Sequence, residues 1–311
     1  MWFILTIAAM FMWGCADVFY KLSMDNDNPD SYLEVAVTLG LIMGFLVPVL
    51  IPFSESGLPL TQLMRENLLF MLVPIGYGVS MLYSNIGLKF LEVSVFSPLQ
   101  NASGAFPVIF LVVYYIAIGR GEILREEVTS FDMAGTVLIV CGIIALSFAE
   151  QRLAGVKADR KRIGAAALLF PLIFCIFDTL ETVVCAIILD GDTTVDEADL
   201  SRLYGAVFFV IGLICWLYIW HKRGRIFNPF TRSNAPRIFA AVCECTAYIF
   251  YVYAIGQKPL FVAPIIASFC VVSVILSRIF LHERLERSRF VCVMFIIAGI
   301  VLLGISEGLS Y

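Results

Sequence analysis

Long runs of apolar residues, separated by short polar connections, make up most of this chain. A helix of about 20 apolar residues crosses the hydrocarbon core of a bilayer, and each run reaches roughly that length. The connections carry charge, proline and glycine, as at 25–30 and 190–199, and none is long enough to form a domain outside the membrane. The pattern therefore predicts an all-α membrane protein with ten transmembrane helices. The expected spans are about 2–21, 33–52, 68–89, 93–118, 131–149, 163–189, 202–221, 236–256, 260–281 and 290–307.

Composition agrees with this pattern and excludes the main soluble classes. Hydrophobic residues make up 60% of the 311 residues and charged residues only 15%, against about 25% charged in an ordinary soluble domain. So little charge cannot cover the surface of a soluble protein, which excludes a cytosolic enzyme and a nucleic-acid-binding protein. The expected partners are membrane lipid and a small-molecule solute, with no nucleic acid. Monomer and homodimer both stay open.

Cysteine and histidine usage predicts neither a metal site nor a cofactor. All nine cysteines lie within apolar stretches without a Cys-x-x-Cys pair, so they are expected to be small hydrophobic side chains. The two histidines, His221 and His282, lie at the edges of spans beside basic residues. This is poor support for a histidine-based metal or acid–base site.

A long internal duplication divides the chain into two halves. With a shift of 157 residues, Glu126 falls on Glu283 and Gly142 on Gly299, and a shift of 161 residues places Asp17 on Asp178. The expected units are residues 1–150 and 163–311, joined by a basic linker at 151–162. Because each half holds an odd number of spans, the two five-helix repeats are inverted relative to each other. Inverted repeats are typical of transporters that bind their solute between the halves.

Several short motifs then resemble one family. Trp13-Gly14 followed by Lys21 is similar to the first span of EamA-type drug/metabolite transporters. An acidic residue sixteen positions before a glycine also resembles that family, as in Glu126…Gly142 and Glu283…Gly299, and so does the stretch 277–285. The first half departs from the family pattern in being a few residues longer at 119–125. The resemblance implies a ten-helix carrier of two inverted EamA-like repeats, but no single substrate, because the family handles amino acids, purines, drugs and sugars.

Ionisable side chains within spans are costly and normally face the bundle interior or a water-filled cavity. In the first span, Trp13, Asp17 and Lys21 share one helix face. Asp17 either takes part in the pathway or forms an ion pair with Lys21 that anchors the end of the helix. Both interpretations stay open on the sequence.

Asp178 and Glu181 lie one turn apart in the sixth span, with no basic residue near them in sequence. Two charged carboxylates this close repel each other, so one is expected to hold a proton at neutral pH. A group of this kind suits a proton-coupled carrier. The alternative is that both carboxylates bond to serines or backbone groups of neighbouring helices.

The remaining candidates form an expected pocket wall. Glu244 and Tyr248 share one face of span eight, Tyr77 and Asn85 lie on its counterpart, span three, and Asn101 lies in a proline-interrupted stretch of span four. Tyrosines are also common at membrane interfaces, and prolines are tolerated in membrane helices, which are the alternative explanations. The predicted substrate-binding residues are Trp13, Asp17, Tyr77, Asn85, Asn101, Asp178, Glu181, Glu244 and Tyr248.

These features favour a secondary transporter that moves a small metabolite or drug-like solute by alternating access, with protons as the candidate coupling ion. No Walker A motif is present, so an ion or solute gradient would supply the energy. The alternative is an intramembrane enzyme that uses Asp178 and Glu181, although no HExxH or GxSxG motif supports it. A channel is less favoured by the duplication. We expect a non-enzymatic, multi-pass protein of the plasma (inner) membrane.

Two arguments conflict over the orientation of the termini. The connections after spans five, seven and nine hold 13 basic residues, against five in those after spans two, four, six and eight. The positive-inside rule then places both termini outside. The family resemblance implies termini inside, and the acidic connection 25–30 agrees with the family.

Overall fold

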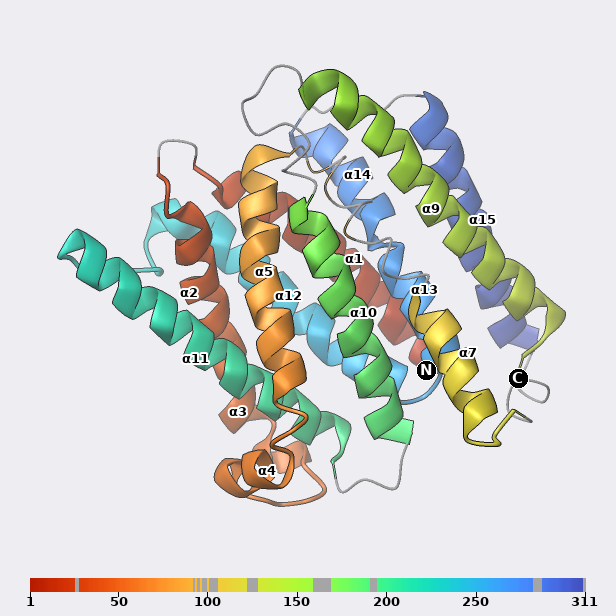
Figure 1. Ribbon diagram of the computed structural model, residues 1–311, viewed down its shortest axis with the longest axis horizontal. Coiled ribbons are helices and arrows are strands. Elements are labelled where there is room, and N and C mark those ends of the chain that lie inside the picture. Colours follow the sequence, from red (N-terminus) through yellow and green to blue (C-terminus); the bar gives the residue numbers. More distant parts are fainter. Residues whose placement is uncertain are drawn as a thin grey trace.

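The structure is a computed structural model that describes residues 1–25, 28–91, 93, 96, 100, 106–121, 128–158, 169–190, 195–281 and 287–309. Over these residues the chain is helical, without a strand (Figure 1). The helices of the first half are α1 (Trp2–Ser23), α2 (Ser31–Gly44), α3 (Leu46–Val49), α4 (Leu60–Glu66), α5 (Leu72–Phe90), α7 (Phe106–Ala117) and α9 (Ser130–Ala158). Those of the second half are α10 (Leu169–Asp190), α11 (Glu197–Arg223), α12 (Ala235–Ile255), α13 (Pro259–Ala267), α14 (Phe269–Phe280) and α15 (Arg287–Leu309).

Six stretches among the described residues are long and apolar enough to cross a membrane, which establishes a multi-pass membrane protein. They are Trp2–Ser23, Ser31–Val49, Leu169–Asp190, Glu197–Arg223, Arg232–Ile255 and Pro259–Phe280. Three shorter apolar helical stretches accompany them, at Phe106–Ala117, Ser130–Leu146 and Phe290–Ser306. The 19-residue α5 packs among these helices but is less apolar. Its polar residues Ser80, Ser84 and Asn85 are buried inside the bundle.

Two helices begin or end at other residues than the sequence predicts. Helix α9 continues to Ala158, well past residue 149, because residues 150–158 are mostly good helix formers without proline. Part of the expected linker is therefore helical, and residues 159–162 lie outside the described part of the chain. Helix α11 begins at Glu197 instead of 202 because the Asp196 side chain caps it, accepting a hydrogen bond from the Asp199 backbone N–H at 2.7 Å.

Span nine is interrupted near its middle. Pro264 lies inside α13, and the helix stops at Ser268 before α14 begins at Phe269. Ser268 Oγ donates to the Pro264 carbonyl at 3.0 Å, so a side chain contributes a hydrogen bond next to the break. The matching region of span four is described only from Phe106 onward.

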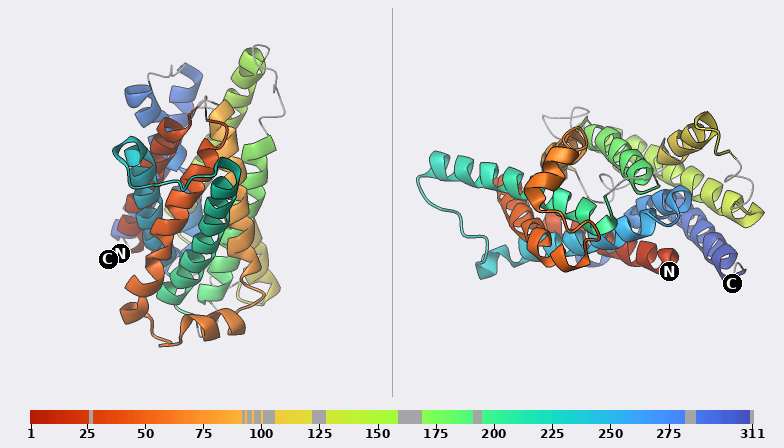
Figure 2. Two further views of the ribbon diagram at one scale, coloured as in Figure 1. Left: turned by 90° about the vertical axis from the view of Figure 1, so that its left-hand side faces the viewer. Right: turned by 90° about the horizontal axis from the view of Figure 1, so that it is seen from below.

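The helices pair across the two halves in a reciprocal way (Figures 1 and 2). Helix α1 packs on α12, and its counterpart α10 packs on α5, the counterpart of α12. The pairs α2–α11 and α9–α15 each join a helix to its own counterpart and flank the four central helices on opposite sides. Two repeats related by a twofold axis produce this arrangement.

Glycine contacts between α9 and α15 show the same reciprocity at the level of residues. A Cβ on Gly299 would lie 2.7 Å from the carbonyl oxygen of Gly135, and a Cβ on Gly142 would lie 3.4 Å from that of Cys292. The shift of 157 residues maps Gly142 onto Gly299 and Gly135 onto Cys292, so the two contacts are equivalent. Small residues allow this close backbone approach, which helices in lipid use for packing.

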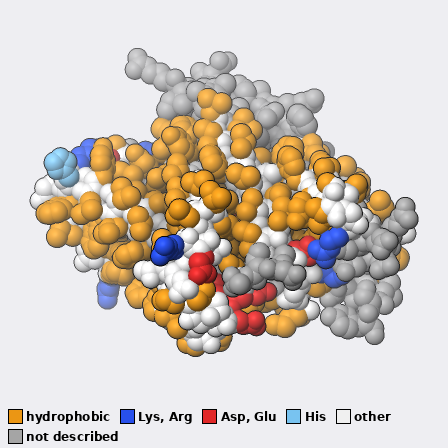
Figure 3. Space-filling model, turned by 60° about the horizontal axis from the view of Figure 1, so that its bottom comes forward, with side chains coloured by type: hydrophobic (Ala, Val, Ile, Leu, Met, Phe, Trp, Pro, Cys, Tyr) orange, Lys and Arg blue, Asp and Glu red, His pale blue; other side chains and the backbone are white. Residues whose placement is uncertain are grey.

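The outer surface is hydrophobic, as a lipid-facing surface must be. Ile4, Ile176 and Ile214 on three different helices are all at least 60% exposed. Figure 3 shows hydrophobic side chains over most of one face, with a few charged side chains among them, mainly in its lower half. The apolar surface is therefore directed at the bilayer, whereas Asp17, Glu181 and Glu244 are buried inside the bundle.

Candidate functional site

Four central helices surround one cavity with the same geometric motif. Each contributes three side chains at positions i, i+4 and i+7, which lie on one helix face. These residues are Trp13, Asp17 and Tyr20 on α1; Phe174, Asp178 and Glu181 on α10; Tyr77, Met81 and Ser84 on α5; and Glu244, Tyr248 and Tyr251 on α12. When the two repeats are aligned, Trp13 is equivalent to Phe174, Asp17 to Asp178, and Tyr77 to Glu244. Leu88, Gln100, Pro107, Thr182, Ala263, Ile266, Ala267 and Phe269 complete the described lining.

The cavity is small in this conformation. It holds about 40 Å³ of free space, which corresponds to roughly three ordered waters. Sites for small organic molecules are usually several hundred Å³ in volume. The four central helices must therefore move apart before a solute enters.

Glu244 has the best-defined environment in the cavity. Its side chain is 5% exposed. Trp13 Nε1–H donates to Oε1 at 2.9 Å, and the Tyr20 hydroxyl donates to Oε2 at 3.4 Å. Both donors come from α1, so the carboxylate ties α12 to its neighbour through the cavity wall.

Glu181 on α10 is the second buried glutamate of the cavity, and it holds the position that Tyr20 holds on α1. The Tyr251 hydroxyl donates to its Oε2 at 3.2 Å and the Cys185 thiol to its Oε1 at 3.4 Å. Thr182 donates to Oε2 at 3.4 Å. Because Tyr251 belongs to α12, this cluster connects the second-half helices α10 and α12 directly.

The repeat-related aspartates have different surroundings. Asp17 is buried, and Ser273 Oγ from α14 donates to its Oδ2 at 2.7 Å. Asp178 is partly buried and lies one turn before Glu181. Lys21 donates its ammonium group to the carbonyls of Leu88 and Leu91, at the C-terminal end of α5. A cation is favourable at that end of a helix.

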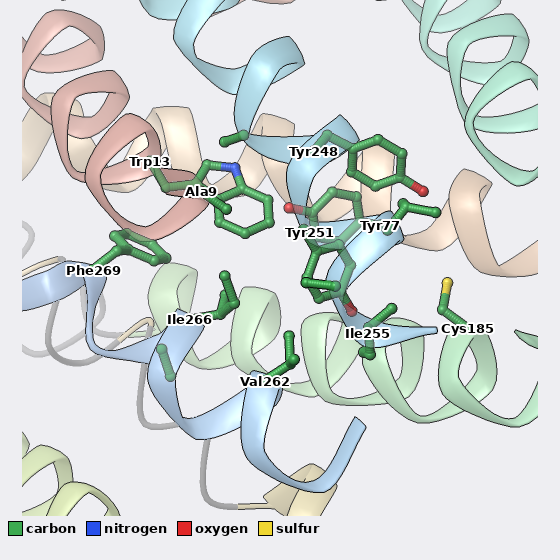
Figure 4. Close-up of a cluster of buried hydrophobic side chains, with 14 of the residues drawn as sticks. Ala9, Trp13, Tyr77, Cys185, Tyr248, Tyr251, Ile255, Val262, Ile266 and Phe269 are labelled. Carbon is green, nitrogen blue, oxygen red and sulfur yellow. The ribbon is translucent and has the colours of Figure 1, made fainter. Parts of the chain in front are cut away.

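Aromatic rings form most of the wall on the α12 side, as Figure 4 shows. The ring centroids of Trp13 and Tyr251 are 5.4 Å apart, and those of Tyr248 and Tyr251 are 6.2 Å apart. Tyr204 on α11 packs behind Tyr248 with 4.7 Å between ring centroids. Within the described part of the chain, the buried hydroxyl of Tyr248 has no hydrogen-bond partner.

The structure gathers seven of the nine predicted residues around the cavity. These are Trp13, Asp17, Tyr77, Asp178, Glu181, Glu244 and Tyr248. Asn85 is buried on α5 but is not among the lining residues, and Asn101 lies outside the described residues. Whether any of them binds a solute stays a prediction.

The sequence analysis did not select several residues that contact this set. Tyr20 and Tyr251 lie at the i+7 positions of the two helix faces that the spacing identifies, although neither is among the predicted substrate-binding residues. Tyr204, Phe269 and Thr182 gave no such signal. Their positions depend on how distant helices cross.

Ion pairs at the two ends of the α2–α11 pair hold the helices around the cavity together. At one end, the Asp30 network joins Asp30 and Glu34 of α2 to three basic residues. Lys222 lies 2.7 Å from Asp30 and Arg237 lies 2.9 Å from Glu34. Arg223 contacts both acids, at 3.2 Å from Asp30 and 2.5 Å from Glu34. This network ties together α2, α11 and the start of α12.

At the opposite end, the Asp199 network is smaller and more buried. Arg202 pairs with Asp199 at 2.7 Å, and their side chains are 3% and 0% exposed. Ser54 donates to the same Asp199 oxygen at 2.7 Å, and Arg202 also donates to the Leu58 carbonyl at 3.0 Å. These contacts fasten the connection after α3 to the N-terminal turns of α11.

Asp30 lies just before α2 and outside the span, where its ionisation responds to these charges. Burial acts to raise the pKa of the Asp30 carboxyl, but hydrogen bonds and charge from Lys222 and Arg223 outweigh that effect. The pKa is therefore lowered from its ordinary value. The ionised carboxylate is the form that the network stabilises.

Comparisons with known proteins identify relatives at the level of family and fold. The model of a family described as the EamA-like transporter family matches residues 1–148 and 165–305. A solved structure titled only as the crystal structure of a protein is 12% identical, with a TM-score of 0.62. That alignment covers 96% of this chain and 95% of the other, which supports a shared fold. No curated protein matches the chain.

Proposed function

Because the chain belongs to the EamA-like transporter family, we propose that it is a secondary carrier that moves a small solute by alternating access. It is a multi-pass membrane transporter, and the plasma (inner) membrane is the proposed location. In the proposed architecture, ten spans form two inverted five-helix repeats, 1–150 and 163–311, joined at 151–162. The observation that carries the proposal is the cavity bounded by repeat-related faces of α1, α10, α5 and α12.

Reciprocal helix pairing supports alternating access for a physical reason. When two repeats related by a twofold axis pack around one site, exchanging their conformations moves the opening from one side to the other. The two networks fasten the two ends of the α2–α11 pair. Opening one end would require Arg223 to separate from Asp30 and Glu34, and opening the other would require Arg202 to separate from Ser54 and the Leu58 carbonyl. The small cavity volume fits a conformation between the two open states.

Proton coupling is the proposed energy source. Asp178 and Glu181 place two carboxylates one turn apart at the cavity wall. A carrier driven by protons needs a group that binds and releases a proton in each cycle, and a crowded carboxylate pair provides one. The alternative of an intramembrane enzyme draws no support from the family, whose description names transporters.

Reconstitution into liposomes tests the carrier function. A thermal-shift screen of metabolites on the purified protein selects the solutes, and uptake is then measured with and without a proton gradient. Saturable uptake that is accelerated by solute on the opposite side of the membrane is the expected result. Flux that does not saturate, or solute recovered as a cleaved product, would contradict a carrier.

We further propose that both termini lie outside, as the basic residues indicate. Three of those residues, Lys222, Arg223 and Arg237, pair with Asp30 and Glu34, which accounts for the acidic residues on the same side. Asp and Glu contribute little to orientation compared with Lys and Arg. A reporter that is active only in the cytoplasm, fused after Tyr311, should be inactive. Activity of that reporter would contradict this orientation and place both termini in the cytoplasm.

A further inference from the structure

We infer that the solute is an organic cation with an apolar body, bound with its charge beside Glu244 and the rings of Tyr248 and Tyr251. The inference rests on the proposed carrier function and names its substrate class. Three independent features of the cavity support it: the charge of its wall, the hydrogen bonding of Glu244, and the arrangement of aromatic rings.

The described wall of the cavity is acidic without a basic counterpart. Four carboxylic acids line it, and the described lining includes no lysine, arginine or histidine. The described partners of Glu244 and Glu181 are an indole, hydroxyls and a thiol, none of which carries positive charge. Lys21 lies close by, but its ammonium group is bonded to backbone carbonyls of α5.

The hydrogen bonds of Glu244 favour its charged form. The indole Nε1–H of Trp13 can only donate, so Oε1 must accept. The Tyr20 hydroxyl also donates, to Oε2, which leaves both oxygens as acceptors. Donors of this kind favour a carboxylate over a carboxylic acid, whereas burial without a counter-ion acts in the opposite direction and favours the acid. A cation in the cavity would remove that penalty, so Glu244 and a bound cation would stabilise each other.

Aromatic rings surround the position where that cation would lie. Trp13, Tyr248 and Tyr251 have neighbouring ring centroids 5.4 and 6.2 Å apart, and the three rings lie close to one another in Figure 4. Ring faces carry negative partial charge and attract ammonium groups. The Tyr248 hydroxyl, which lacks a partner in the described part of the chain, is available to accept a hydrogen bond from an N–H group.

The rest of the described wall is apolar and suits a hydrophobic body. Met81, Phe174, Ile266 and Phe269 contribute aliphatic and aromatic surface without charge. An anionic solute would add negative charge to a wall that already holds four acids. A neutral solute would leave the Glu244 charge unbalanced. An organic cation would place its charge beside the carboxylates and its apolar body against the hydrophobic part of the wall.

Three probes of one shape test the charge requirement on purified protein. They are 2-phenylethylammonium, 2-phenylethanol and 3-phenylpropionate, with binding measured by calorimetry and by thermal shift. The cation should bind at least about tenfold more tightly than either analogue. Equal binding of the three probes, preference for the neutral or anionic probe, or no binding of the cation would overturn the inference. This comparison needs no variant.

Glu244→Gln assigns the effect to one carboxylate, because it keeps the shape and removes the charge. Affinity for the cation should fall roughly 30-fold or more, as when a buried charge pair loses one partner, while binding of 2-phenylethanol stays unchanged. Glu66→Gln, an exposed carboxylate on α4, is the matched control and should change neither. Unchanged cation affinity in a folded Glu244→Gln protein would remove Glu244 from the site.

Transport assays keep this inference separate from the carrier function. Saturable exchange of neutral or anionic solutes without cation binding would refute the substrate class and leave the carrier intact. Selective binding of the cation without flux of any solute tested would support the substrate class and refute the carrier function.

Discussion

The two halves of this transporter build the cavity from equivalent helix positions and give those positions different chemistry. The aspartates are shared, as Asp17 and Asp178. Beside these aspartates, each helix pair has one glutamate and one tyrosine, but the glutamate lies on the second helix of one pair and on the first helix of the other. The α1–α12 pair places Tyr20 opposite Glu244, whereas the α10–α5 pair places Glu181 on the first helix and Tyr77 on the second. Equivalent positions in the two repeats therefore form the cavity, and the residues at those positions differ between the halves.

The two ends of the α2–α11 pair also differ, in the number of basic residues and in their exposure to solvent. The Asp30 network uses three basic residues and is partly open to solvent, since the Lys222 side chain is 46% exposed. The Asp199 network uses a single basic residue, Arg202, that is 3% exposed. Exposed pairs are individually weak because water screens them, whereas removing one partner of a buried pair leaves a charge without compensation. The two ends should therefore respond unequally to the same mutation.

The largest expected effect separates the two shared aspartates. Asp178→Asn keeps shape and hydrogen bonding but fixes a neutral side chain, so gradient-driven uptake should fall to background while solute exchange continues. Asp17→Asn should retain gradient-driven uptake, because Asp17 bonds to Ser273 and has no second carboxylate one turn away on its helix. Uptake and exchange are measured in proteoliposomes with the proton gradient imposed or collapsed.

Normal concentrative uptake in Asp178→Asn would remove the coupling role of that residue. Loss of folded protein in both asparagine variants would instead assign the two carboxylates to helix packing. Equal loss of coupling in the two variants would show that the halves are equivalent in this function.

The next effect concerns stability at the two ends. Arg202→Gln leaves the buried Asp199 charge unpaired and should destabilise the fold by about 3–5 kcal/mol. Lys222→Gln removes a half-exposed partner that water screens, so it should lower the stability much less than Arg202→Gln. Thermal unfolding in detergent measures both, with exposed Arg225→Gln as the control. Similar melting temperatures for the two variants would contradict the contrast between the ends.

A third test makes one half resemble the other. Trp13→Phe gives α1 the residue that α10 has at Phe174, and it removes the 2.9 Å hydrogen bond to Glu244. A hydrogen bond to a charged group contributes about 1.5–3 kcal/mol, so solute affinity should fall roughly 10- to 100-fold. Phe174→Trp adds an indole without a defined acceptor and should not increase affinity. Unchanged affinity in Trp13→Phe would exclude the indole as a determinant.

The smallest expected effect is the response of the Asp30 network to acid. Because the pKa of Asp30 is lowered in the folded protein, its stabilising contribution is present above the unfolded pKa of about 3.9 and is lost as pH falls through the folded value. Melting temperature should therefore decline below about pH 4 in the native protein. Asp30→Asn should reduce that decline by a small amount, and an identical acid profile in the variant would contradict the assignment.

Hydropathy was enough to predict the membrane class and the helical fold, short motifs indicated the family, and helical spacing selected seven of the residues that line the cavity. The reason is physical: a membrane span needs a long apolar run, and a polar residue within it is costly enough to stand out. Asp17, Asp178 and Glu244 could be identified in this way because each is a charged residue within an apolar helix, on a face defined by the 3.6-residue period.

Contacts between distant helices were decided only by the tertiary structure. The partners of Glu244 are 224 and 231 residues away in the chain, and Ser273 reaches Asp17 across 256 residues. Periodicity states which side of a helix is polar, but not which helix that side meets. Helix packing brought Phe269 of α14 into the cavity wall and Tyr204 of α11 against Tyr248, although both side chains are unremarkable along the sequence. The same packing left Asn85 buried but outside the cavity lining, because helix packing determines which polar side chains share one space.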